Sequence, residues 1–344
     1  MNSFGRIFRI SIFGESHGES VGIVIDGCPA GLPLTVDDFL PDLERRKGGT
    51  QKGTTPRQEE DLPIFKSGLF NNKTTGAPIT ILFENKNVRS ADYERQRDVP
   101  RPGHADFVAR KKFGGNEDYR GSGHFSGRLT VALVAAGVIA KKILLTPFQT
   151  SASEDVITVS SSILEIGGEK DLDKGLQKAI DAKDSIGGII ECRASGLPIG
   201  LGEPFFDSAE SLLAHIVLAI PAVRGIEFGT GFAAAKMFGS QHNDAIENME
   251  GKTRTNHAGG IVGGLTNGNE LVFRIAIKPT SSTPKEQNTL NWETGKVENA
   301  SVKGRHDLCI ALRVPVILEA VTAIVLADLM MLEQRIPRII DANL

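Results

Sequence analysis

The chain has 344 residues, of which 40% are hydrophobic and 24% are charged, and its formal net charge is −3. This length is enough to bury a large core, in one large domain or in two. The slightly acidic balance excludes the global positive field of a nucleic-acid protein, so we expect no nucleic-acid partner, although a local cationic pocket is compatible with it.

Three cysteines, Cys28, Cys192 and Cys309, are widely spaced and form no Cys-x-x-Cys pair. This usage is typical of a reduced, cytoplasmic protein and not of a disulfide framework or a zinc site. The histidines are scattered singly, so the sequence predicts no metal. The apolar run of residues 316–332 contains Glu319 and Asp328, whose charges would be costly in lipid, and it therefore predicts a buried helix and no membrane span.

The first two predicted strands flank a turn with reactive side chains. The runs Phe8–Phe13 and Val21–Ile25 are rich in β-branched and aromatic residues, which favours strands. Between them, Gly-Glu-Ser-His-Gly presents Ser16 and His17 at a strand end. The pattern also matches a hydrolase nucleophile elbow, but the sheet and oxyanion loop that such an elbow follows do not fit into the 13 preceding residues.

A helix is predicted from Thr35 to Arg46, kinked or shortened by Pro41. Two interpretations of its basic end are open. Arg46 complements the helix dipole, or it lies over an anionic ligand together with Lys52 of the next glycine-rich loop. A Walker-type phosphate loop is excluded because the order is Lys-Gly-Thr and not Gly-Lys-Thr.

Residues 78–83 predict a strand, and the polar residues 84–100 predict a long loop, which is usually functional or disordered. The loop ends in Arg-Pro-Gly-His, where a rigid turn directs Arg101 and His104 to one place. A plain surface turn before a helix over residues 105–113 is the alternative.

The most strongly predicted helix covers residues 129–145, which are apolar on nearly all sides. Ser126, at its glycine-rich start, caps the helix, helps to bind an anion, or does both. Residues 146–169 give no clear signal, and residues 171–182 predict an amphipathic surface helix.

The tripeptide Gly-Leu-Pro occurs at residues 31–33 and 196–198, each time between a short apolar strand and a helix, the second of which covers residues 209–220. This repetition indicates an internal duplication.

The last third begins with the glycine-dense residues 256–264, which let the backbone lie against a planar ligand or a phosphate but lack a nicotinamide fingerprint. A strand over residues 270–277 leads to Lys278–Pro284, which is either a phosphate-binding segment or a flexible linker. An Arg-His-Asp cluster precedes a buried helix over residues 315–334.

Together these segments resemble the chorismate synthase family from about Phe4 to Leu332. The resemblance is strongest at residues 14–29, 123–130 and 305–320, and residues 101–106, 256–263 and 278–282 match as well. It implies an α+β fold, a β-α-β sandwich with an internal pseudo-twofold duplication and helices packed between antiparallel sheets. It also implies one domain over residues 1–344, with duplicated halves of about 1–185 and 186–344, and a homotetramer.

The activity implied is the last common step of the shikimate pathway, in which 5-enolpyruvylshikimate 3-phosphate loses phosphate and a ring hydrogen to give chorismate. Reduced FMN is required without net redox change, because it lends an electron as phosphate leaves and recovers it with the hydrogen. The sequence leaves open whether the chain reduces its own flavin with NADPH. Because no reductase domain is visible, we expect an external flavin reductant.

The resemblance also implies roles for single residues. His17 acts on the departing phosphate, His104 faces the reduced flavin, and Asp307 relays a proton together with Ser16. The residues expected to bind the carboxylates and the phosphate of the substrate are Arg46, Arg101, Arg128 and Lys52. The positions that match those around FMN are His124, Phe125, Ser126, Ala222, Gly263, Lys278, Pro279, Thr280, Ser281, Ser282 and Arg305.

The chain departs from the family at two of these places. Lys52 stands where many members have arginine, which keeps the charge but loses the planar fork, and His124-Phe125 replaces Arg-Ser. On the residues alone, two other classes are alternatives: a serine hydrolase built on Ser16, and a non-catalytic binder of phosphorylated ligands or nucleic acid.

Overall fold

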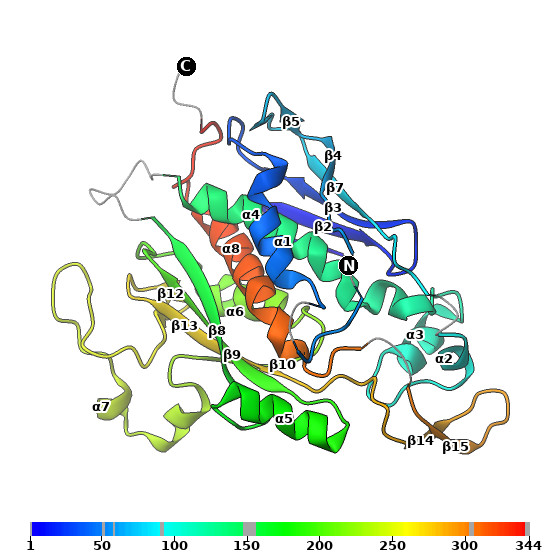
Figure 1. The fold of residues 1–344 in the computed structure, drawn as a ribbon. Coiled ribbons are helices and arrows are strands. Elements are labelled where there is room, and N and C mark those ends of the chain that lie inside the picture. The colour runs from blue at the N-terminus through cyan, green and yellow to red at the C-terminus, as the bar shows by residue number, and fades with distance from the viewer. Residues whose placement is uncertain are drawn as a thin grey trace.

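The computed structural model describes residues 2–49, 52–57, 59–89, 93–146, 156–302 and 306–340. Two antiparallel sheets enclose a pair of long apolar helices, which form the centre of the molecule (Figure 1). The expected α+β sandwich with helices between antiparallel sheets is confirmed.

The first sheet has the strand order β1-β2-β3-β7-β4. Its strands are β1 (Ser3–Phe4), β2 (Arg9–Gly14), β3 (Ser20–Asp26), β4 (Ile64–Ser67) and β7 (Ile79–Glu84). The central pair shows why the sheet forms, because every second side chain of β3 is apolar and faces an apolar partner on β7, as in Val21 opposite Phe83 and Ile23 opposite Ile81. These side chains are fully buried against the helices.

The second sheet has the order β10-β13-β9-β8. Its strands are β8 (Thr158–Ile166), β9 (Gly188–Ser195), β10 (Val223–Phe228) and β13 (Leu271–Ile277). Strand β8 lies in the segment that gave no clear signal in the sequence. Its inward positions include Ser161, whose hydroxyl donates to the Pro315 carbonyl and to Glu319, so the apolar alternation is interrupted by a polar contact.

The two sheets share one connectivity. The spatial order β2-β3-β7-β4 is repeated as β8-β9-β13-β10. Helix α1 (Leu40–Arg46) follows β3 as α6 (Ala209–Val217) follows β9, and α4 (Thr130–Leu144) follows β7 as α8 (Val314–Leu332) follows β13. This match supports the internal duplication.

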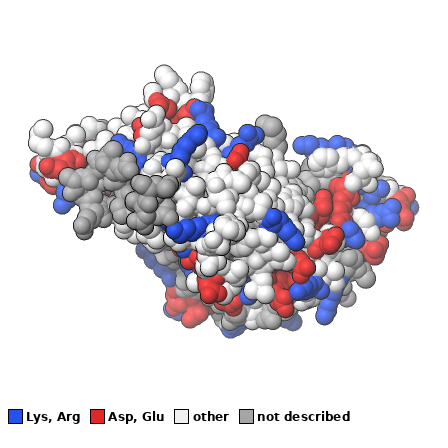
Figure 2. Space-filling view, turned by 90° about the horizontal axis from the view of Figure 1, so that it is seen from above, with Lys and Arg blue, Asp and Glu red and all other residues white. Residues whose placement is uncertain are grey.

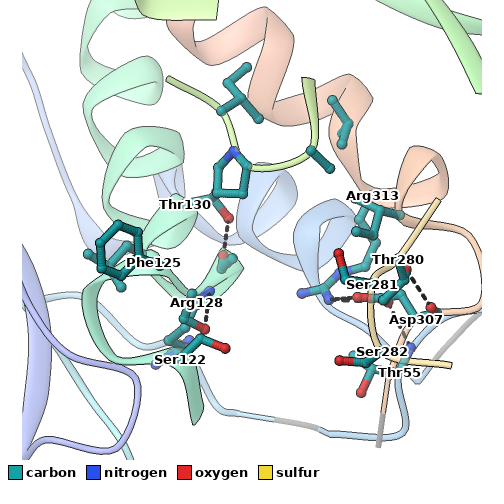
Figure 3. Close-up of a pocket in the computed structure, with 18 of the residues that line it drawn as sticks. Thr55, Ser122, Phe125, Arg128, Thr130, Thr280, Ser281, Ser282, Asp307 and Arg313 are labelled. Atoms are coloured by element: carbon teal, nitrogen blue, oxygen red, sulfur yellow. Dashed lines mark hydrogen bonds and ion pairs between the residues drawn. The ribbon is translucent and has the colours of Figure 1, made fainter. Parts of the chain in front are cut away.

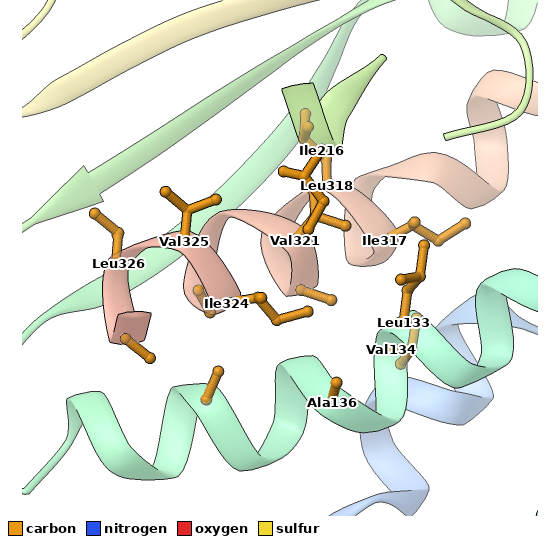
Figure 4. Close-up of a cluster of buried hydrophobic side chains, with 14 of the residues drawn as sticks. Leu133, Val134, Ala136, Ile216, Ile317, Leu318, Val321, Ile324, Val325 and Leu326 are labelled. Atoms are coloured by element: carbon orange, nitrogen blue, oxygen red, sulfur yellow. The ribbon is translucent and has the colours of Figure 1, made fainter. Parts of the chain in front are cut away.

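Helices α4 and α8 pack on each other and on the inner faces of the sheets, and α6 packs Ile216 against α8 near Leu318 (Figure 4). Nearly every residue of both helices is buried, so they are apolar all round and not amphipathic. They approach closely at Gly137, where a Cβ atom would lie 2.2 Å from the Cβ of Ala320.

The two acidic residues of α8 are buried with partners. Asp328 accepts hydrogen bonds from the backbone N–H groups of Arg6, Ile7 and Phe8 at 2.7–2.9 Å. Glu319 accepts both terminal nitrogens of Arg45, at 2.7 and 2.8 Å, and Lys141 at 2.9 Å. In the described part of the chain one helical stretch, Ile310–Leu332, has the length and apolar composition of a membrane span, and most of it is buried within the fold.

Several predicted helices are found with changed ends. The helix predicted from Thr35 is split into a 3-10 turn, η1 (Val36–Asp38), and α1. Pro41 lies in the first turn of α1, where a proline is tolerated, and it does not kink the helix. The predicted loop of residues 84–100 contains α2 (Glu94–Asp98), so the prediction of an unstructured loop is wrong there. The next helix, α3 (Asp106–Phe113), ends at Gly114 in the left-handed conformation.

The remaining elements are short or peripheral. They are β5 (Leu69–Phe70), β6 (Lys73–Thr74), η3 (Arg120–Phe125), η4 (Gly127–Leu129), α5 (Leu172–Ala182), η5 (Phe205–Asp207), η6 (Gly231–Lys236), α7 (Gly239–His242), β11 (Ile261–Val262), β12 (Leu265–Thr266), β14 (Gln287–Leu290), β15 (Val297–Ala300) and η7 (Ile310–Arg313). On the face seen in Figure 2, charged residues of both signs are spread over the surface and form no continuous basic area.

We expect Gly137→Ala to destabilise the protein. Overpacking a well-packed core costs about 1–3 kcal/mol, which outweighs the roughly 1 kcal/mol that alanine gains over glycine in a helix. Denaturant unfolding measures the difference. Gly239→Ala is the matched control, because a Cβ atom at Gly239 has no neighbour within 4 Å. A Gly137→Ala protein as stable as the wild type would contradict the close helix contact.

Candidate active site

A cavity of about 820 Å³ lies where loops from both halves of the chain meet (Figure 3). This volume is within the usual range for ligand pockets. Part of the lining is apolar and comes from Leu218–Val223 and from Ile310, Val314 and Ile317. The described lining residues also include eight Lys or Arg and three Asp or Glu, so the wall has an excess of positive charge.

Two of the predicted substrate arginines share a carboxylate at the cavity wall. Arg46 Nη2 donates to Asp61 Oδ2 at 2.5 Å, and Arg128 Nη1 donates to Asp61 Oδ1. All three side chains are buried. Burial alone would raise the pKa of Asp61, but the two guanidinium groups hold it below its ordinary value.

Burial lowers the pKa of Arg46 to about 10, and Asp61 opposes this shift. Its Nε atom is buried and has no hydrogen-bond partner among the described residues. An acceptor from a ligand would satisfy it. The neighbouring Arg45 instead pairs with Glu319 outside the cavity, so the two basic residues at the end of α1 have different surroundings.

The predicted Arg101–His104 turn is held by one acid, Asp106. Arg101 donates Nε and Nη2 to the two oxygens of Asp106, each at 2.7 Å. The His104 Nδ1 atom lies 2.5 Å from Asp106 Oδ1. Burial lowers the pKa of His104, and its bond to Asp106 opposes this shift.

The segment Lys278–Ser282 is fixed in place and is not a flexible linker. Lys278 Nζ and Ser281 Oγ both donate to the Gly103 carbonyl, at 2.6 and 2.8 Å, and Arg101 Nη1 donates to Ser282 Oγ at 3.0 Å. Thr280 Oγ1 donates to the Asp307 carbonyl at 2.7 Å. The segment therefore ties the Arg101–His104 turn to the loop of Asp307.

Asp307 lies between two donors at the cavity (Figure 3). Its carboxylate accepts the Thr55 N–H at 2.8 Å and Arg313 Nη1 at 3.0 Å. Arg305, which was predicted to bind the cofactor, lies outside the described residues.

Ser16 and His17 lie behind the cavity lining. Both are buried, and a Cβ atom at Gly121 would come within 2.6 Å of His17 Nε2 and 2.9 Å of Ser16 Oγ. Ser16 Oγ accepts Arg57 Nη1 at 3.1 Å, and Arg57 lines the cavity. A serine-hydrolase interpretation loses support, because the Ser16 side chain is not exposed to the cavity.

The other predicted cofactor residues divide into two groups. The lining includes His124, Phe125, Ser126, Ala222, Lys278, Pro279, Thr280, Ser281 and Ser282. Gly263 is not among the described lining residues. Lys52, which was predicted to bind the substrate, is not among them either, and its Nζ donates to Gln177 at 3.2 Å. Ser126 Oγ accepts the Arg128 N–H, so it caps the turn before α4.

Comparison with known protein families matches residues 8–331 to chorismate synthase. The chain belongs to the chorismate synthase family. The chorismate synthase of Chitinophaga pinensis is 69% identical over 339 residues, which cover 98% of this chain and 99% of that protein. The chorismate synthase of Methanocaldococcus jannaschii is 41% identical over 364 residues, which cover 96% of each. A crystal structure of a chorismate synthase matches with a TM-score of 0.70 and 25% identity, and covers 96% of this chain and 93% of that chain.

Chorismate synthase is a carbon–oxygen lyase of the shikimate pathway, which leads to the aromatic amino acids. The sequence analysis did not predict several charged residues at the cavity of this protein. They are Arg57, Glu59, Asp61 and Arg313, which line the cavity, and Asp106, which belongs to the matched stretch of residues 101–106 but was given no role. The signal for Asp61 was weak, because it is the last of three consecutive acids and only the fold shows that it is buried.

We expect Asp61→Asn to lower the free energy of unfolding by about 3–5 kcal/mol, because two buried guanidinium groups lose their shared counter-charge. Glu60→Gln is the matched control. Its side chain is 64% exposed and pairs with Lys86, so its loss should cost about 1 kcal/mol or less. Denaturant unfolding measures both, and equal effects would contradict the assignment.

The same experiment has a pH dependence. The pKa of Asp61 is lower in the folded state than its ordinary value of about 3.9, so its stabilising contribution is complete above that pH and is lost as the pH falls through the folded value. The difference between the wild type and Asp61→Asn should therefore narrow in acid.

Proposed function

We propose that this chain catalyses the anti-1,4-elimination of phosphate and a ring hydrogen from 5-enolpyruvylshikimate 3-phosphate to give chorismate, and that it requires reduced FMN. The observation that carries the proposal is the composition of the cavity wall, which combines an excess of cationic side chains with many apolar ones. Membership of the chorismate synthase family supports it.

The excess of cationic side chains in the lining suits a substrate with two carboxylates and a phosphate. Arg46, Arg101 and Arg128 line the cavity, and each is already oriented by a carboxylate of the protein. Guanidinium groups fixed in this way bind an anion without first losing side-chain freedom. The net positive charge of the lining also contrasts with the net charge of −3 of the whole chain.

The apolar lining residues suit a flat aromatic ring system. The connection from α6 to β10 brings Leu218, Ile220 and Pro221 to the wall, which Ile310 of η7 and Ile317 of α8 also line. In this connection Ala222 has φ of 76°, a conformation that is costly for a non-glycine residue, and its carbonyl accepts the Lys278 N–H at 2.9 Å. We propose that these residues and the segment Lys278–Ser282 hold FMN.

Bound reduced FMN supplies the electron-rich ring that helps to cleave bonds whose hydrogen is poorly acidic. The residues of the chain bind and orient the substrate and the flavin, and they exchange protons with them. His104 holds a proton at the cavity wall, between Asp106 and the ligand space. Asp307, held by Arg313 and Thr55, accepts a proton. His17 acts on the departing phosphate from behind Gly121, where no side chain separates it from the cavity.

We further propose a cytoplasmic homotetramer that receives electrons from an external flavin reductant. Large apolar side chains are exposed in the second half of the chain, among them Phe206 at 92%, Phe232 at 83% and Met249 at 97%. Exposure of this kind is typical of an interaction surface. A second copy of the chain is the partner that the family resemblance implies.

The test of the proposed reaction is anaerobic phosphate release from 5-enolpyruvylshikimate 3-phosphate. We expect release with photoreduced FMN and none with oxidised FMN or without flavin. His104→Ala should lower turnover by about 10²–10⁴-fold, because a positioned acid–base group is lost. His215→Ala, which removes an exposed histidine of α6, is the control and should keep the wild-type rate. Release that does not depend on flavin would refute the proposal.

The assembly is tested by sedimentation. Phe206→Asp combined with Phe232→Asp should shift the mass from tetramer toward smaller species, because charges enter a buried apolar contact. Phe70→Asp is the control, since Phe70 is 71% exposed but lies in the first half of the chain. A wild type that sediments as a monomer at micromolar concentration would contradict the tetramer.

A further inference from the structure

Asp106 is the first residue of α3 and contacts two residues of the preceding turn at once. Its Oδ2 accepts the backbone N–H and the Nε of Arg101, at 3.0 and 2.7 Å. Its Oδ1 accepts Arg101 Nη2 at 2.7 Å and lies 2.5 Å from His104 Nδ1. The side chain is only 13% exposed, so water competes little for these contacts.

These contacts account for most of the donors of Arg101. Nε is used by Asp106, and the two hydrogens of Nη2 are used by Asp106 and by Ser122 Oγ at 2.9 Å. Nη1 donates to Ser282 Oγ and has one hydrogen left. Arg101 therefore offers a ligand one hydrogen bond and a fixed charge, and not an open bidentate fork.

The same geometry selects one tautomer of His104. An ionised carboxylate only accepts, so the ring nitrogen that faces Asp106 Oδ1 must carry a hydrogen. Arg101 Nη2, 3.1 Å from the same ring nitrogen, is also a donor and already has acceptors in Asp106 and Ser122. In the neutral imidazole, Nδ1 is then protonated and Nε2 is the basic atom. No described residue forms a hydrogen bond with Nε2, although His104 lines the cavity.

We propose that Asp106 is a positioning residue that holds His104 with its Nδ1 protonated, so that Nε2 is the atom that exchanges a proton with the reactants. The exchange at Nε2 rests on the proposed function, whereas the tautomer does not. Because one carboxylate orients both Arg101 and His104, it also fixes the position of the guanidinium group that faces the substrate's negative charge relative to the imidazole that carries the proton.

Three charged groups act on the His104 ring. Burial is the largest single cause and lowers its pKa; Asp106 raises the pKa, whereas Arg101 and Lys278 lower it. Removal of the carboxylate charge therefore has a defined sign, because the pKa of His104 falls further and less imidazolium is present near neutral pH.

The tautomer is tested first on the unmodified protein, without substrate or flavin. Nitrogen-15 NMR of the histidine rings, with His104 assigned by its absence in His104→Gln, distinguishes protonated Nδ1 from protonated Nε2. We expect the neutral ring of His104 to carry its hydrogen on Nδ1. A hydrogen on Nε2 overturns the proposal whatever reaction the protein catalyses.

The second arm is Asp106→Asn, which keeps an acceptor oxygen of the same size but loses the charge. We expect the pKa of His104 in the NMR titration to fall by roughly 1–3 units, the scale typical of an adjacent opposite charge. The basic limb of the kcat profile should move to lower pH in parallel. A merely structural role would lower kcat equally at every pH.

Asp98→Asn is the matched control. It removes one negative charge from the neighbouring helix α2, where Asp98 is 34% exposed and lies 3.8 Å from Arg110. It should leave both the titration of His104 and the pH profile unchanged. An unchanged pKa of His104 in Asp106→Asn, or an equal shift in Asp98→Asn, would overturn the role of Asp106. If the wild type shows the expected tautomer but releases no phosphate with reduced FMN, the proposed function fails and the positioning of His104 stands.

Discussion

The structure of this cavity depends on the burial of guanidinium groups. A buried cation is costly unless a partner lies within hydrogen-bond distance, and here each of the central arginines has a carboxylate: Arg46 and Arg128 share Asp61, Arg101 has Asp106, and Arg313 has Asp307. These pairs fix the direction of each planar group before a ligand arrives. Positive charge is still in excess at the wall, since the lining has more cations than acids. An anionic ligand therefore meets a preorganised field and not a set of flexible side chains.

The elements that position these pairs follow from ordinary packing. Arg46 is at the end of α1, which the Arg45–Glu319 contact fastens to α8. Arg101 and His104 lie on a turn that Lys278 and Ser281 hold through the Gly103 carbonyl. The cavity thus joins loops that are far apart in the sequence, and contacts within the protein hold these loops in place.

Much of the fold was predictable because its strongest signals are apolar. The runs that became α4 and α8 are hydrophobic on all sides, and the alternation in β3 and β7 is clear. Strand β8 was not predicted because its inward-facing Ser161 forms a hydrogen bond with Glu319. A contact between residues so far apart leaves no local pattern in the sequence. Most of the residues expected at the site line the cavity, whereas Asp61 was not predicted and Asp106 was given no role of its own. In the sequence, an acidic residue that forms an ion pair with an arginine of another loop cannot be distinguished from an acidic residue exposed to solvent.

The repeated connectivity has a further consequence for the cavity. In both halves a short 3-10 turn with an arginine, Arg128 in η4 and Arg313 in η7, leads into the long central helix, and both helices begin at the cavity with Thr130 and Val314 in its wall. The N-terminal ends of two backbone dipoles therefore converge on one ligand space. The main chain itself contributes to the attraction of anions there. Each repeat supplies one of the two helix N-termini, so neither repeat alone would form this site.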